Sequence, residues 1–134
     1  MWKSELTVEV KSWSKHHIDA VVFAENGSYW RCTWIYGHLE MCQKHHTWTL
    51  LKKLANLSSL PWLCFGDFNE ILWPHEKIKG INREATMMQV VRDTIRNCSL
   101  VDLGCKVHPL TWSSRRYGLY LIEERLDHFL CNQE

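Results

Sequence analysis

The segment LPWLCFGDFNEIL, residues 60–72, joins an apolar run to side chains that could do chemistry. Residues 60–65 are almost all apolar, and Gly66 is then followed by a carboxylate at Asp67 and an amide at Asn69. Asp and Asn commonly form Asx turns, which is the simplest explanation. An active site at the end of a buried strand would produce the same pattern. The residues alone leave both interpretations open.

Other polar side chains follow or interrupt predicted strands. Residues 36–38 (Tyr-Gly-His) come at the end of one such strand, and Thr111 lies near the end of another. Polar groups just past central strands collect at one edge of a sheet, where functional sites tend to lie. Asp127 lies inside an apolar strand, where a carboxylate needs a partner. A structural ion pair with Arg125 or Arg116 would satisfy it, and the tyrosine could be a core aromatic.

The first third of the chain predicts an antiparallel sheet. Apolar and polar residues alternate over 6–11, which is typical of a half-buried strand. A valine-rich run over 18–24 predicts a second, more fully buried strand. Asn26-Gly27 is the strongest hairpin signal in the chain and leads into a return strand over 29–36.

The later segments alternate between helical and strand-like periods. In chain order they predict a helix over 46–57, a central strand over 62–65, a helix over 84–98, and short strands over 110–113 and 125–131. Strands and helices therefore mix. The predicted fold class is α/β, a layered sandwich with a largely antiparallel or mixed sheet and flanking helices.

Composition indicates one compact domain without a strong charge bias. The chain has 134 residues, of which 46% are hydrophobic and 23% charged, and its formal net charge is +1. This balance excludes an intrinsically disordered chain and lacks the basic footprint of a dedicated nucleic-acid binder. Short basic groups could each touch phosphate, although such groups are more often solvated surface: Lys52-Lys53, Lys77 with Lys79 and Arg83, and Arg115-Arg116.

Cysteine and histidine spacing argues against disulfides and zinc. Six cysteines lie far apart with no Cys-x-x-Cys pair, which predicts reduced thiols in an intracellular protein of the nucleus or cytoplasm. The histidines at 16, 17, 38, 45 and 46 lack the spacing of a structural zinc site. No stretch approaches the length of a membrane span, so no membrane partner is expected. The strand-like pattern starts close to Met1, as it would in a segment from inside a domain.

Taken in order, six segments resemble the endonuclease/exonuclease/phosphatase superfamily, and most closely the endonuclease domain of plant-type LINE retrotransposons. They are Trp34–Glu40 (WIYGHLE), Pro61–Leu72 (PWLCFGDFNEIL), Glu76–Arg83, Cys98–Gly104 (which contains DLG), Thr111-Trp112, and Glu123–Phe129 (which contains ERLD). Together they span nearly the whole chain. Small departures from the family pattern occur at Leu39, Ile81 and His128.

The resemblance implies a sandwich of two sheets flanked by helices, a DNase-like fold, and magnesium-assisted hydrolysis of DNA phosphodiesters. It implies that Asp67 aligns or deprotonates the attacking water and that Asn69 holds Asp67 and a phosphate oxygen. On an extended segment, residues two apart point to the same side, which agrees with a shared role. Both are also candidate secondary contacts of the metal.

Further site residues are implied by the same resemblance. Tyr36 would hydrogen-bond the scissile phosphate, and Asp127 would orient a catalytic histidine. Substrate contacts are expected from Thr111, Trp112, His38 and Arg83.

The resemblance also predicts an incomplete domain. The family's early asparagine, its magnesium-binding glutamate and its final Ser-Asp-His motif have no counterparts in residues 1–134. His128 follows Asp127 but should point to the opposite face of its strand. Since catalytic groups act as a unit, the chain is expected to be inactive alone. The alternative is a non-catalytic remnant that binds nucleic acid or protein, and exposed sheet edges could support self-association.

Overall fold

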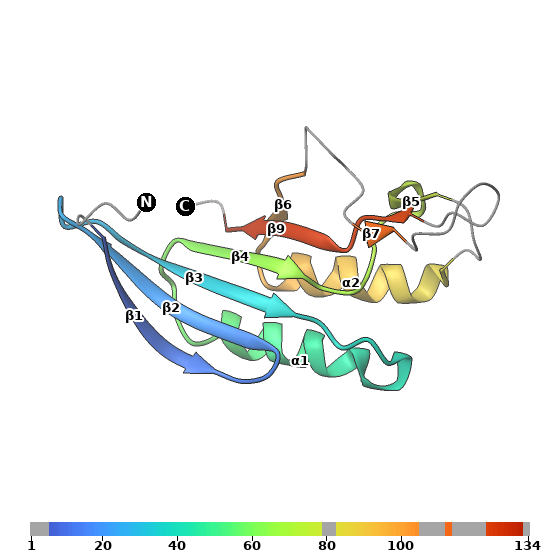
Figure 1. Ribbon diagram of the computed structural model, residues 1–134, viewed down its shortest axis with the longest axis horizontal. Coiled ribbons are helices and arrows are strands. Elements are labelled where there is room, and N and C mark those ends of the chain that lie inside the picture. Colours follow the sequence, from blue (N-terminus) through green and yellow to red (C-terminus); the bar gives the residue numbers. More distant parts are fainter. Residues whose placement is uncertain (1–5, 79–82, 105–111, 114–122, 133–134) are drawn as a thin grey trace.

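A computed structural model describes residues 6–78, 83–104, 112–113 and 123–132 (Figure 1). Its elements, in chain order, are β1 (Leu6–Trp13), β2 (His17–Ala24), β3 (Tyr29–Tyr36), η1 (Met41–Gln43), α1 (Lys44–Ala55), β4 (Trp62–Asp67), η2 (Pro74–Glu76), β5 (Lys77–Ile78), α2 (Ala85–Asn97), β6 (Val101–Asp102), β7 (Trp112–Ser113), β8 (Glu123–Glu124) and β9 (Asp127–Cys131). The predicted α/β class is confirmed.

The strands form a six-stranded mixed sheet and a small three-stranded sheet. The larger sheet has the order β1-β2-β3-β4-β9-β6, and the smaller has the order β5-β8-β7. Strands β1, β2 and β3 form the predicted antiparallel meander, and the chain turns at Asn26-Gly27. It then crosses through α1, so that β4 pairs parallel to β3. Strand β9 returns antiparallel to β4, which places β4 inside the sheet as predicted.

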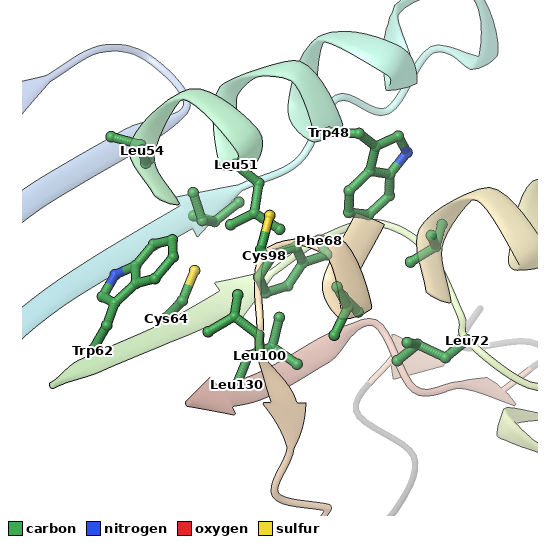
Figure 2. Packing of buried hydrophobic residues seen from close by; sticks show 13 residues of the cluster. Trp48, Leu51, Leu54, Trp62, Cys64, Phe68, Leu72, Cys98, Leu100 and Leu130 are labelled. Carbon is green, nitrogen blue, oxygen red and sulfur yellow. The ribbon is translucent and has the colours of Figure 1, made fainter. Parts of the chain in front are cut away.

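The core lies between one face of the large sheet and the two helices (Figure 2). From the sheet it takes alternate residues of β3, β4 and β9, including Ile35, Cys64 and Leu130, all of which are fully buried. From α1 and α2 it takes residues at helical spacing, such as Leu51 and Val91. Side chains that recur every second residue on the strands and about every 3.6 residues on the helices therefore pack together in one apolar layer.

A polar pair lies beneath the C-terminal end of α1 within this layer. The Asp19 carboxylate accepts hydrogen bonds from Arg31 Nε at 2.8 Å and Nη2 at 2.9 Å, and from Thr33 Oγ1 at 2.7 Å. Arg31 also donates to the carbonyl of Leu54 at the end of the helix, where a cation is favoured. The Trp62 ring lies against its guanidinium, 4.8 Å from ring centroid to Cζ. The pair is buried and fully enclosed by these partners.

On the opposite face of the large sheet, the apolar side chains of β1 are exposed. Leu6, Val8 and Val10 on β1 are 40%, 44% and 54% exposed, so the expected half-buried strand is wrong on this point. The reason is that the two described helices pack on the other face of the sheet, so neither of them covers the apolar side of β1. β1 is also an edge strand, and self-association there stays a prediction.

Four differences from the predicted elements concern short or marginal segments. Strands β5, β6 and β8 are only two residues long and show no alternation by which they could be predicted. The strand expected over 110–113 is described only at Trp112–Ser113, and the rest of it lies outside the described residues.

None of the described helices is long and apolar enough to cross a membrane. The described cysteines are free thiols, and burial raises the pKa of Cys64.

Candidate active site

Three predicted site residues form a row across neighbouring strands of the large sheet. Tyr36 on β3 is the register partner of Asp67 on β4, and Asp67 is in turn the partner of Asp127 on β9. The residues before Tyr36 and after Asp127, Ile35 and His128, are buried on the helix face. Because side chains alternate along a strand, the phenol and both carboxylates lie on the uncovered face. We call these three residues the candidate row.

Two glycines bring β3 and β4 close together at the end of this row. A Cβ atom on Gly66 would lie 2.2 Å from the carbonyl oxygen of Ile35, and one on Gly37 would lie 2.2 Å from that of Phe68. Gly66 also has a φ of +133°, which side chains rarely adopt. The glycine of the GDFN segment is therefore required by the backbone of the site, whatever the chemistry of Asp67.

Gly66→Ala should lower the free energy of unfolding by about 3 kcal/mol or more, because the new methyl group meets backbone rather than a movable side chain. The matched control is Gly27→Ala, where φ is +86° but the added Cβ meets nothing within 4 Å. It should cost only about 1–2 kcal/mol, the conformational term alone. Urea unfolding of both variants measures the difference, and equal losses would contradict the clash.

Asn69 holds the Asp67 end of the candidate row through two hydrogen bonds. Its backbone N–H donates to Asp67 Oδ1 at 2.9 Å, and its Nδ2 donates to the carbonyl of Gly37 at 2.7 Å. Asn69 has a φ of +54° and lies beyond the end of β4, so the expectation that it extends the strand and points with Asp67 is wrong. The chain leaves the extended conformation directly after Asp67. An Asx turn is thus present, and it fixes the Asp67 carboxylate at the strand end.

The Asp67 carboxyl has the electrostatics of a weak base. Burial raises its pKa, the N–H of Asn69 opposes that change, and the charge of Asp127 raises the pKa further. A carboxylate with a raised pKa accepts a proton more readily at neutral pH than an ordinary aspartate. A raised pKa is one of the properties expected of a general base.

The carboxylates of the candidate row could provide some of the oxygen ligands that a hard cation such as Mg²⁺ prefers. Among the described residues, no three His, Cys, Asp or Glu side chains are grouped to hold a metal ion. Mg²⁺, however, is usually held by one or two carboxylates together with water and substrate phosphate. Asp67 and Asp127 offer two such oxygen ligands on adjacent strands. The two carboxylates thus fit part of a magnesium site.

The predicted substrate contacts fall in three places. His38 lies at the sheet edge beside the row, and its backbone N–H donates to Thr47 Oγ1 at 3.1 Å. Arg83 is largely buried and forms ion pairs with Glu124 and with Glu70, the latter at 3.3 Å, so its charge is already neutralised. Thr111 lies outside the described residues, and Trp112 belongs to β7 in the small sheet.

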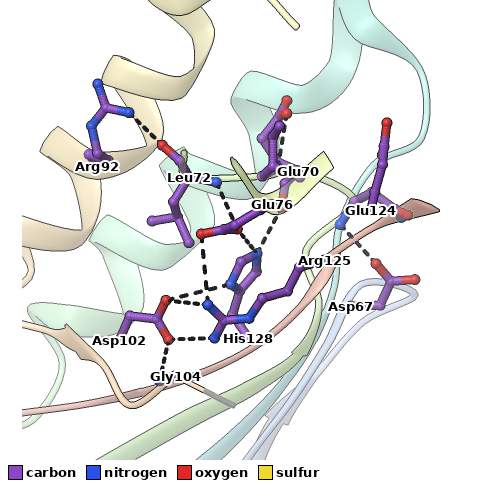
Figure 3. A network of polar contacts seen from close by, with 12 residues as sticks. Asp67, Glu70, Leu72, Glu76, Arg92, Asp102, Gly104, Glu124, Arg125 and His128 are labelled. Carbon is purple, nitrogen blue, oxygen red and sulfur yellow. Dashed lines mark hydrogen bonds and ion pairs between the residues drawn. The ribbon is translucent and has the colours of Figure 1, made fainter. Parts of the chain in front are cut away.

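A buried polar network, which the sequence did not predict, holds the segment that follows Asp67 and β4 (Figure 3). Arg125 pairs with Asp102 at 2.8 Å and lies 3.7 Å from Glu76. His128 Nε2 donates to the carbonyl of Glu70 at 2.9 Å, and its ring is buried on the helix face, as expected. Lys44 pairs with Glu70 at 3.1 Å, so Glu70 is a structural residue. The available signal was the group of charged residues in segments that otherwise have a core-like pattern: Lys44, Glu70, Glu76, Asp102 and Arg125.

Comparisons with known proteins support the fold. No protein-family model matches the chain, and no curated protein matches its sequence. Among solved structures, it is similar to the endonuclease domain of TRAS1, a telomere-specific non-LTR retrotransposon, with a TM-score of 0.70 at 14% identity. The match covers 94% of this chain and 56% of that chain. At this identity the likeness shows the fold alone. The chain therefore has the fold of part of a DNase-like endonuclease domain.

Proposed function

We propose that the chain carries the water-activating part of a metal-dependent DNA endonuclease site, within a single partial domain. The observation that carries this proposal is the candidate row, in which a phenol and two carboxylates meet on one exposed sheet face. The similarity to a retrotransposon endonuclease domain adds a fold in which such a site is expected. The raised pKa of Asp67 supports a role as proton acceptor.

Each residue of the candidate row can be given a role in phosphodiester hydrolysis that its position allows. Asp67, held by the N–H of Asn69, orients a water and accepts its proton as that water attacks phosphorus. Tyr36, which is 36% exposed, donates its O–H to a non-bridging phosphate oxygen. Burial raises the pKa of Asp67, and the negative charge of Asp127 on the adjacent strand raises it further. Magnesium bound beside these carboxylates would neutralise the charge that develops on the phosphate.

The 134-residue chain alone should not complete this reaction. The histidine that follows Asp127, His128, is buried on the opposite face, so it cannot protonate a leaving group at the candidate row. Catalytic groups that act as a unit lose nearly all activity when one is absent. Purified chain with Mg²⁺ should therefore produce no Asp67-dependent nicking of supercoiled plasmid.

Two comparisons test the proposal. The first sets wild-type chain against Asp67→Asn in the plasmid assay, and nicking that disappears in the variant would overturn the expected inactivity. The second replaces the corresponding segment of the TRAS1 endonuclease domain by residues 61–69 of this chain. The chimera should nick DNA, should lose nicking with Asp67→Asn, and should keep it with Leu63→Val as control. A folded but inactive chimera would contradict the assignment of Asp67.

The alternative function remains a non-catalytic remnant that binds nucleic acid or protein. The exposed apolar face of the large sheet favours it, since a contiguous apolar surface is typical of an interaction site. Binding of plasmid without cleavage, together with an inactive chimera, would support this alternative.

A further inference from the structure

A cavity of about 750 Å³ lies on the side of the large sheet that the helices cover. Its inner wall is formed by buried members of the core, among them Trp62, Cys98 and Leu100 (Figure 2). Its volume is within the range of about 300–1,000 Å³ that is usual for ligand pockets. The candidate row lies on the other face of the sheet, so this cavity lies outside the proposed nuclease site.

An aromatic ring and a cation form a pair at the rim of the cavity. The Arg92 guanidinium lies over the Trp73 ring, with 4.1 Å between Cζ and the ring centroid. It donates to the carbonyl of Leu72 (Figure 3) and, at 2.7 Å, to Oε1 of Gln89. Trp73 is still 48% exposed, and Val101, which also lines the cavity, is 42% exposed. Trp and Arg are enriched at the energetic centres of protein interfaces, and a pair that is ordered beforehand loses little freedom when a partner binds.

The charge at the cavity is positive. Among the described residues that line it, the charged ones are Arg92 and Arg96. Burial raises the pKa of the Cys98 thiol, and Lys52, in the last turn of α1, is close enough to lower it in part. Asp93, 3.9 Å from Arg96, adds one negative charge. Both helices end at the cavity, and each C-terminal dipole is equivalent to about half a negative charge. The three cations therefore leave a surplus of about one positive charge.

An apolar wall with a positive rim favours a protein segment over the other classes of ligand. Interfaces with nucleic acid are more polar and more positively charged than this cavity. A small molecule usually has about 70–90% of its surface buried in its pocket. This cavity is instead open beside Trp73 and Val101, which are about half exposed. A segment that inserts one apolar side chain and lays carboxylates along the rim matches both the apolar wall and the charge.

We propose that the cavity binds an acidic segment of a partner protein that carries a large apolar side chain. The apolar side chain packs between Trp73 and the inner wall, and the carboxylates of the segment pair with Arg96 and Lys52. This inference goes beyond the proposed function and does not depend on it, because the cavity and Asp67 lie on opposite sides of the sheet. A partner bound there would leave the candidate row uncovered.

The test is binding of three fluorescein-labelled 12-residue peptides to the whole chain, measured by fluorescence anisotropy at pH 7.5. The first peptide combines acidic residues with leucine and phenylalanine. The second has lysine in place of the acidic residues, and the third has serine in place of leucine and phenylalanine. The first should bind about tenfold more tightly than either of the others, because it alone matches both the charge of the rim and the apolar wall.

Two pairs of variants locate the binding. Trp73→Ala should weaken binding of the first peptide about tenfold, whereas Trp13→Ala, which removes a 78% exposed indole on β1, should leave it unchanged. Arg96→Glu should also weaken it about tenfold, because the reversed charge repels the carboxylates of the peptide. Its control is Lys15→Glu, the same change of charge at an exposed residue of the turn between β1 and β2. Circular dichroism confirms that each variant is folded.

Further outcomes decide between the occupants. Asp67→Asn should bind the first peptide with wild-type affinity, so failure of the proposed nuclease function leaves this result intact. Absence of binding by the first peptide would overturn the inference, as would equal affinity for all three peptides or equal affinity of the folded Trp73→Ala and Arg96→Glu variants. Displacement of the peptide by a 12-nucleotide DNA strand would overturn it in favour of nucleic acid. A wild-type dimer that Trp73→Ala dissociates would overturn it in favour of a second copy of the chain.

Discussion

Asp19→Ala should lower the free energy of unfolding by about 3–5 kcal/mol, the cost expected when one partner of a buried ion pair is removed. The variant leaves the Arg31 guanidinium inside the core, with its side chain only 3% exposed, and leaves Thr33 Oγ1 without its acceptor. Arg31 also joins the end of α1 to the sheet, so loss of the carboxylate that orients it should weaken this contact as well. Since small domains are typically stable by about 5–15 kcal/mol, the loss is a large part of the total.

Urea unfolding followed by circular dichroism measures this effect, and Glu9→Ala is its matched control. Glu9 also pairs with a cation, Lys11 at 2.7 Å, but both side chains are about half exposed. The control should change stability by less than about 0.5 kcal/mol. A similar small change in Asp19→Ala would show that Arg31 reaches water easily and that the pair does not organise the core.

Arg125→Met should have a comparable effect, about 3–5 kcal/mol at pH 7, with a distinctive dependence on pH. Arg125 faces two carboxylates, Asp102 and Glu76, and its loss removes one of the positive charges that stabilise both of them. Burial alone would raise the pKa of Asp102, but His128, Arg125 and the N–H of Gly104 together hold it well below its usual value. In the wild type this carboxylate therefore stabilises the fold above about pH 4, and that stability is lost as the pH falls further.

In Arg125→Met the sign reverses, since protonation relieves a buried carboxylate that has lost its partner. The stability difference from wild type should be largest at pH 7 and should shrink toward pH 4 as Asp102 and Glu76 take up protons. Guanidinium unfolding at pH 7, 5.5 and 4 measures it. Arg96→Met is the control, because its side chain is 76% exposed and lies 3.9 Å from Asp93. A difference that stays constant with pH would contradict the ion-pair explanation.

Most of the large elements could be predicted from local pattern. The valine-rich run of β2, the Asn26-Gly27 turn and β3 each have one dominant signal, and the predicted return strand has the observed bounds. Helix α2 follows from apolar residues that recur at helical spacing. The two-residue strands could not be predicted, because their pairing is decided by contacts with distant segments such as β9 rather than by their own composition.

Only the residues of the candidate site that lie at strand ends could be predicted from the sequence. Asp67 and Tyr36 could be placed because β4 and β3 have clear ends, and their direct pairing depends on the parallel register, which local pattern does not fix. The inward turn of Asn69 depends on backbone that leaves the strand at a positive φ. The closeness of His16 to Tyr36 could have been found from the hairpin, since His17 pairs with Ile35. The pairing of Arg83 depends on Glu124, 41 residues away along the chain.

The position of β9 beside β4 has a consequence for when the site forms. Strands β1, β2 and β3 fold through neighbouring segments, and α1 connects β3 to β4 locally. Asp67 meets Asp127 only after a strand 60 positions later in the chain has entered the sheet. Contacts of such large sequence separation close slowly, because loop entropy must be lost before the pairing is gained. The candidate row therefore belongs to the last step of folding, and a nascent chain lacking β9 would carry an ordered meander with half of its acidic pair.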